Sequence, residues 1–229
     1  MQMLIPFLIQ EMSKLISDNE PVDANELDEL VNSRNIPLRE NHRQFLIKYG
    51  NCKTLLINGF SDFTFKQFKD YYLDDELFYT DRIPLSTVYI GTDFADELLC
   101  IDNKTGKIYV YYDQKKDLLY YDRLESLLFT CFMKSNYLET VFDRIRRNIK
   151  IFSPKAFLKK NEKHKICDIQ GDSYYLIGNE LYLVRNDVYE TYYAPLHLFK
   201  IKYRFMMANV YEGGVINDYL SCRVRPAHQ

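Results

Sequence analysis

The spacing of apolar residues changes at about residue 54, and this change constrains the fold more than any other feature of the chain. Before it, apolar side chains recur every three or four residues, which predicts helices over residues 2–18, from Asp23 onward and over residues 40–49. Asp23 is predicted to cap the second helix, with Glu26 folding back toward it as in a capping box. Gly50 is a typical helix stop and is predicted to end the third.

After the change, short runs of β-forming residues alternate with turn residues. Gly106 and the pair Gly178-Asn179 predict hairpin turns, and residues 123–149 have a helical pattern. We therefore predict an α+β fold with a mixed or antiparallel sheet of about five or six strands, helices packed against it, and a smaller C-terminal β-containing extension. The expected strands are Thr54–Ile57, Phe63–Phe68, Thr87–Gly91, Leu98–Asp102, Lys107–Tyr112, Leu118–Tyr121, Ser173–Ile177 and Glu180–Val184.

The charge pattern predicts where the chain divides. From Arg144 to Lys165 there are nine basic residues, and only Glu162 opposes them. Ser153-Pro154 lies inside this stretch, so we expect one domain over residues 1–150 and an extension or small second domain over residues 151–229. The basic stretch lacks a recognised nucleic-acid-binding motif and the sequence pI is about 6.1. We expect it to face solvent or to pair with the acidic half, and no nucleic acid is expected as a partner.

Several classes of functional site lack their sequence signals. The five cysteines are scattered without a C-x-x-C pair, and the four histidines are isolated. No glycine-rich phosphate loop is present. The apolar run Met3–Ile9 is interrupted by Pro6 and is far shorter than a membrane span of about 20 residues. We therefore expect a cytoplasmic protein with no metal, no cofactor and no membrane association.

One enzymatic alternative remains open at this point. Asp93 or Asp96, followed by a strand that ends in Asp102-Asn103-Lys104, resembles the way some nucleases hold a magnesium ion. The same residues also form an ordinary strand that runs into a turn, which explains each of them without a metal. The turn is the favoured interpretation, and the chain is predicted to bind rather than to catalyse.

The middle of the chain is strongly acidic. Between Lys69 and Asp102 there are nine acidic residues against Lys69 and Arg82, a local charge of −7, with tyrosines interleaved. Such a surface would attract a basic protein, although a solvated loop face is an equally good explanation. The candidate partner-binding residues are Asp74, Asp75, Glu76, Asp93, Asp96, Glu97, Tyr111, Tyr112 and Asp113.

The order of these motifs over residues 1–150 resembles the SUKH superfamily. Ile36-Pro37-Leu38 followed by Asn41–Gly50 is similar to the family's first motif, and Ile90–Asp102 followed by Gly106–Asp113 is similar to its second. Cys52 and Phe94-Ala95 depart from the family's glycines.

The resemblance implies helices packed on a mixed sheet and a binding role. Many bacterial members are immunity proteins that cover the active site of a toxin, often a nuclease. On this basis we expect an immunity protein that neutralises a basic toxin domain through its acidic surface. Other members are scaffolds in fungi or occur in large DNA viruses, so a viral or scaffold module that binds a cellular partner is the alternative.

Overall fold

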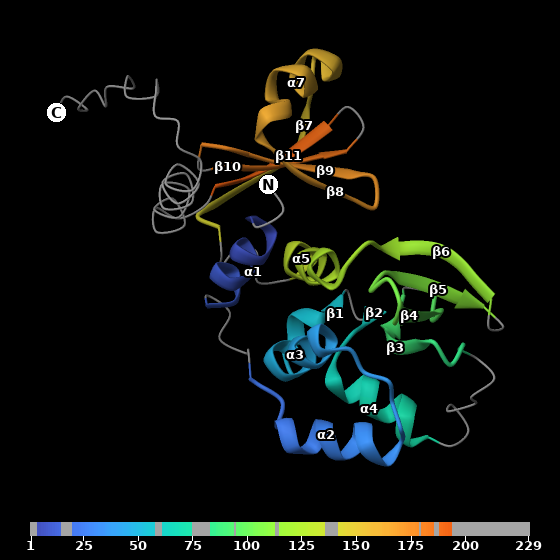
Figure 1. Ribbon diagram of the computed structural model, residues 1–229. Helices are drawn as coiled ribbons and strands as arrows, with labels where there is room; N and C mark the ends of the chain where they lie inside the picture. Colours follow the sequence, from blue (N-terminus) through green and yellow to red (C-terminus); the bar gives the residue numbers. More distant parts are fainter. Residues whose placement is uncertain are drawn as a thin grey trace, which may run out of the picture.

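The computed structural model describes residues 4–14, 20–57, 61–74, 83–93, 95–112, 115–135, 142–178, 180–185 and 188–193. These ranges contain six α-helices, two antiparallel sheets of four and five strands, and a two-stranded ribbon (Figure 1). The predicted α+β class is confirmed, with the strands divided between two main sheets rather than gathered in one. Within the described ranges, no helix combines the length and the apolar character needed to cross a membrane.

The first helices form where the apolar spacing predicts them: α1 (Leu4–Lys14), α2 (Ala24–Ser33) and α3 (Glu40–Tyr49). The Asp23 carboxylate caps α2 by accepting a hydrogen bond from the backbone N–H of Asn25 (2.9 Å). Glu26 does not complete the predicted capping box, because it forms an ion pair with Lys69 (2.6 Å). Gly50 follows α3 at a crowded position, since a Cβ there would lie 2.5 Å from the carbonyl oxygen of Leu46.

A short connection leads from α3 to the next helix. It contains the single turn η1 (Lys53–Leu55) and the ribbon of β1 (Leu56–Ile57) and β2 (Ser61–Asp62).

Helix α4 (Phe65–Leu73) corrects the predicted strand at Phe63–Phe68. The aromatic residues there favour strands, but Phe65, Phe68 and Tyr72 are spaced for one helical face and all three are buried. Thr64 caps the helix by accepting from the N–H of Gln67 (3.2 Å). The helical spacing and the cap therefore outweigh the strand propensity.

The four-stranded sheet has the order β3-β4-β5-β6, with every pairing antiparallel. Its strands are β3 (Thr87–Thr92), β4 (Leu98–Asp102), β5 (Ile108–Tyr112) and β6 (Lys115–Tyr121). The predicted turn between β4 and β5 is present, with Gly106 at φ +74°. Helix α5 (Leu124–Lys134) follows β6 and is buried along almost its whole length.

The second sheet corrects the predicted helix over residues 123–149, because residues 144–150 form strand β7 (Arg144–Lys150). The sheet order is β7-β11-β10-β9-β8. Helix α7 (Pro154–Asn161) and the turn η2 (Glu162–His164) connect β7 to β8. The remaining strands are β8 (Lys165–Ile169), β9 (Asp172–Ile177), β10 (Glu180–Arg185) and β11 (Val188–Tyr193). Strands β9 and β10 pair as the predicted hairpin requires, with Ile177 opposite Glu180, although Asn179 of its turn lies outside the described residues.

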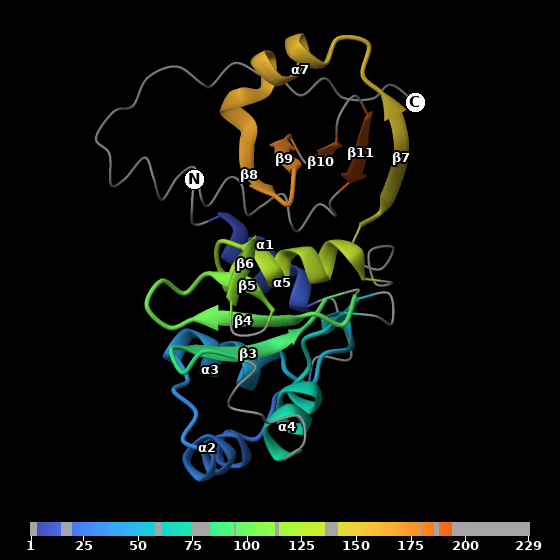
Figure 2. The ribbon, with the colours of Figure 1, turned by 90° about the vertical axis from the view of Figure 1, so that its right-hand side faces the viewer.

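Helices α1 and α5 lie between the two sheets, and α7 covers the outer face of the second sheet (Figures 1 and 2). One continuous core joins the two halves, since Phe129 of α5 contacts Tyr174 of β9 edge to face with ring centroids 5.0 Å apart. On the outer face, Phe157 of α7 stacks on Tyr189. The second sheet is therefore covered on both faces.

Candidate functional site

The loop between β3 and β4 contains three of the candidate acids, and the structure assigns them different roles. The Asp93 carboxylate is 4% exposed and accepts hydrogen bonds from the N–H groups of Ala95 (2.8 Å) and Glu97 (3.1 Å). Its backbone N–H also donates to the carbonyl oxygen of Glu97 (3.2 Å). Asp93 is therefore a buried support of the loop, and its predicted place on an exposed surface is wrong.

Asp96 and Glu97 are exposed at the tip of this loop, as predicted. Asp96 has φ +60°, a left-handed conformation that Asp tolerates better than most residues. Because Asp93 ties the loop at two backbone positions, the two carboxylates project from a defined backbone. A defined backbone lowers the entropy lost when a partner binds.

Of the two tyrosines at the end of β5, one is likewise buried and the other exposed. Tyr111 is 4% exposed, and burial raises its pKa to about 12, so it is part of the core and not of a binding surface. Tyr112 is 67% exposed. Leu98 pairs with Tyr111, which places Tyr112 at the same end of the sheet as Glu97.

Among the remaining candidates, the structure places only Asp74, which lies away from this end of the sheet. Asp74 is exposed but follows α4, whose last residue accepts a hydrogen bond from Arg34 through its carbonyl oxygen (3.5 Å). Arg34 begins the connection to Arg39, and Arg39 donates to the carbonyl oxygen of Asn103 at the opposite end of β4. Asp75, Glu76 and Asp113 lie outside the described residues. The structure thus brings together Asp96, Glu97 and Tyr112.

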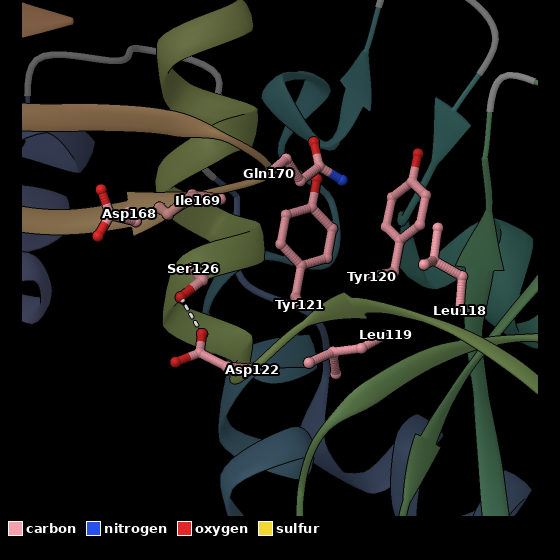
Figure 3. A pocket seen from close by; sticks show the side chains of 9 residues that line it. All are labelled: Leu118, Leu119, Tyr120, Tyr121, Asp122, Ser126, Asp168, Ile169 and Gln170. Atoms are coloured by element: carbon pink, nitrogen blue, oxygen red, sulfur yellow. Dashed lines mark hydrogen bonds between the residues drawn. The ribbon is translucent and has the colours of Figure 1, made fainter. Parts of the chain in front are cut away.

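A pocket of about 610 Å³ lies between the two halves of the molecule (Figure 3). Strand β6 supplies two exposed leucines and two tyrosines, the start of α5 supplies an Asp and a Ser, and the turn from β8 to β9 closes the far side. The lining residues are Leu118, Leu119, Tyr120, Tyr121, Asp122, Ser126, Asp168, Ile169 and Gln170.

The two carboxylates of the pocket already have partners. Asp122 accepts from Ser126 (2.6 Å) and lies 3.2 Å from the guanidinium of Arg123. Asp168 forms an ion pair with Lys165 (2.9 Å) and also accepts from a serine hydroxyl. The pocket therefore offers apolar and phenolic surface, which suits recognition better than proton transfer.

Tyr120 connects the pocket with the acidic loop. Burial and the negative charges of Asp93 and Glu97 raise the pKa of its phenol, which places both carboxylates within electrostatic range. A hydrogen bond with the side chain of Gln170 lowers the pKa of Tyr120 and so partly offsets these effects. We call Asp96, Glu97, Tyr112 and the lining of the pocket the acidic site.

The alternative of a magnesium site does not match the geometry. Asp96 precedes β4 and Asp102 ends it, so the strand's length of roughly 13 Å separates them, too far for one ion. Asp102 accepts from the N–H groups of Lys104 (3.0 Å) and Thr105 (2.8 Å) and from Lys116 (2.8 Å). The Lys116 contact and the turn hold the pKa of Asp102 at about 2. These are the contacts of a turn and a surface ion pair.

Other reactive groups give no second site in the described part of the chain. Burial raises the pKa of Cys167 to about 12, and the pKa values of Cys100 and Cys131 are also raised by burial, so these thiols stay protonated at neutral pH. Among the described residues, no three His, Cys, Asp or Glu side chains form a cluster suited to a metal ion.

Comparison with protein-family models, with curated proteins and with solved structures found no match to this chain. The acidic site is thus defined by its own geometry. Sequence reasoning identified its carboxylates but missed the pocket. Leu119 and Gln170 both line the pocket, and residues so far apart in the chain carry no local signal that they come together. The paired leucines in a predicted strand were the one available hint.

Proposed function

We propose that this chain is a protein-binding protein that uses the acidic site to dock a partner with a basic surface. The observation that carries the proposal is the loop held by Asp93, which exposes Asp96 and Glu97 on a defined backbone. Glu97 lies within electrostatic range of Tyr120, which lines the large apolar and phenolic pocket. A rim of charge beside a pocket that receives an anchoring side chain is the usual arrangement of a specific protein interface.

The charge of the surrounding chain supports a basic partner. Residues 1–143 contain 15 basic and 24 acidic side chains, a net charge of −9. A field of this sign speeds association with a cationic protein and discriminates against anionic ones.

The resemblance of residues 1–150 to the SUKH superfamily supports a specific form of this function. In this form the chain is a cytoplasmic immunity protein that binds a basic toxin domain, most simply a nuclease, and blocks it by occlusion. It acts by binding, with no metal, no cofactor and no catalytic step of its own. The alternative is a scaffold or viral module that binds a cellular protein through the same surface.

The test uses a toxin domain encoded by a gene beside this one. Co-expression with the chain should restore growth of cells that produce the toxin, and the purified proteins should form a complex. The double variant Asp96→Lys/Glu97→Lys should weaken the complex by about tenfold or more, because two attractive contacts become repulsive. Isothermal titration calorimetry measures the affinity.

The control reverses the same number of charges elsewhere. Glu20 and Glu29 are exposed before and on α2, so Glu20→Lys/Glu29→Lys should leave affinity and protection close to wild type. Equal losses from both double variants would show that only overall charge matters and would refute the acidic site. Binding to a different protein, without protection from any toxin, would replace the immunity role by the scaffold role.

A further inference from the structure

The positive charge of the chain is concentrated beyond residue 143. Residues 144–229 contain 15 basic and 8 acidic side chains, a net charge of +7, in contrast to the −9 of the preceding residues. Of these residues the acidic site includes only Asp168, Ile169 and Gln170, and none of them is basic. The described part of the C-terminal half shows where many of the cations lie.

Seven cations lie on strand β7 and helix α7, two elements that follow each other in the chain. Strand β7 forms one outer edge of this sheet, and the chain passes from it directly over to α7 (Figure 2). All seven side chains on these two elements are exposed. We call this set the basic ribbon: Arg144, Arg146, Arg147 and Lys150 on β7, and Lys155, Lys159 and Lys160 on α7.

The ribbon has little compensating charge. Between residues 142 and 164 the only acids are Asp143 and Glu162. Five of the seven cations, all except Arg144 and Arg146, form no ion pair with any residue that the structure describes. Crowded like charges repel one another, so the ribbon produces a strongly positive local field.

Protection of a sheet edge explains only part of this pattern. Charged side chains and bulges on outer strands prevent unwanted pairing, and β7 has both, with Asn148 at φ +57° beside a register shift against β11. The three lysines of α7, however, lie on a helix with no edge to protect.

Phe152 also needs another explanation. It lies between β7 and α7 and is 100% exposed, and it is the one large apolar side chain exposed in residues 142–178. A fully exposed aromatic ring among cations is the combination with which proteins bind single-stranded nucleic acids, since the cations follow the phosphates and the ring stacks on a base.

We infer that the basic ribbon and Phe152 bind single-stranded nucleic acid. A membrane surface would require several apolar side chains exposed together for insertion, and an acidic protein would require an apolar patch to bury. Residues 142–178 expose Phe152 alone. This inference revises the expectation from sequence that the basic stretch has no nucleic-acid partner, and it is independent of the acidic site.

The experiment measures binding of the full-length chain to fluorescein-labelled 20-nucleotide RNA and DNA single strands by fluorescence anisotropy. Binding should weaken with salt, with a slope of log K against log salt of about −0.7 for each phosphate contacted. Arg147→Glu/Lys150→Glu should reduce affinity by about tenfold or more and make the slope shallower. Phe152→Ala should reduce affinity by about tenfold through lost stacking, with the slope unchanged. Both sites are exposed, so circular dichroism should show folded variants.

Matched controls separate the possible outcomes. Lys53→Glu/Lys107→Glu reverses two exposed charges in the first half and should have little effect on affinity. Asp96→Lys/Glu97→Lys should not weaken nucleic-acid binding, which keeps this test distinct from that of the proposed function. Absence of binding at 50 mM salt would overturn the inference. The inference would also be overturned if poly-glutamate bound as tightly as nucleic acid and its binding were unaffected by Phe152→Ala. A preference for phosphatidylserine vesicles over nucleic acid would overturn it as well.

Discussion

His42 shows how burial of a single titratable side chain can make the stability of the protein depend on pH. The imidazole is 1% exposed, lies edge to face against Phe68 with centroids 5.6 Å apart, and its Nε2 has no hydrogen-bond partner among the described residues. Desolvation lowers its pKa from 6.5 to about 3. The folded protein therefore holds His42 neutral in a range where the unfolded chain protonates it.

This difference predicts a loss of stability in mild acid. Below pH 6.5 the unfolded state binds a proton that the folded state excludes, so the free energy of unfolding falls as pH decreases toward 3. Between pH 7 and pH 5 the loss from this group is about 2 kcal/mol. Urea unfolding of the wild type and of His42→Leu at both pH values measures it, and the variant should lack this part of the loss. An identical pH dependence in both proteins would contradict the assignment.

Among the elements, β3 depends on one close backbone approach. A Cβ on Gly91 would lie 2.2 Å from the carbonyl oxygen of Asp62 and 2.6 Å from the ring of Phe63, just before α4 begins. Gly91→Ala must therefore push β3 away from the β2–α4 segment, and we expect it to destabilise the protein by about 3 kcal/mol.

Gly178 provides the comparison for this prediction. It has φ +63° and open space around its Cα, so Gly178→Ala carries only the cost of the left-handed backbone, about 1–2 kcal/mol. Equilibrium unfolding in urea compares the two variants. If Gly91→Ala costs no more than Gly178→Ala, the close approach is not what requires glycine at position 91.

The elements that could be predicted from the sequence are those whose signals are local. The cap at Asp23, the stop at Gly50 and the turns at Gly106 and Gly178 all lie within a few residues of what they determine. Strand β7 had no such signal, because its partner β11 comes about 40 residues later and its alternating cations resemble a helix surface as well as a strand. The same distinction between local and long-range signals applies to the site.

Within the site, exposure of Asp96 and Glu97 followed from their charge. Burial of Asp93 did not, because only the folded loop shows that its carboxylate accepts from two backbone N–H groups. An Asp side chain can accept hydrogen bonds from the backbone N–H groups that follow it and so favours such a turn, but the net charge of the segment outweighed this signal.

At the scale of the whole molecule, the shared core predicts that the two sheets lose stability together. Tyr174 is 3% exposed and contacts Phe129 of α5, so Tyr174→Ala should destabilise the protein by about 3–5 kcal/mol. Hydrogen exchange should show reduced protection in β3–β5 as well as in β8–β10.

Phe157→Ala is the matched aromatic truncation on the outer face. Its ring contacts Tyr175, Tyr182 and Tyr189 of the second sheet, so its loss should leave protection of the four-stranded sheet unchanged. Loss of protection confined to β8–β10 in Tyr174→Ala would show instead that the halves open independently.

The position of α5 has a consequence for how the protein is made. Its residues from Leu124 to Met133, apart from Glu125, are buried by α1, by the first sheet and by strands that follow the helix in the chain. During translation the helix leaves the ribosome before β8 to β10 exist, so part of its apolar surface meets water until about fifty more residues have emerged. The nascent chain therefore exposes apolar surface for a time, and a fragment released from a ribosome that stalls near residue 143 would be prone to aggregate.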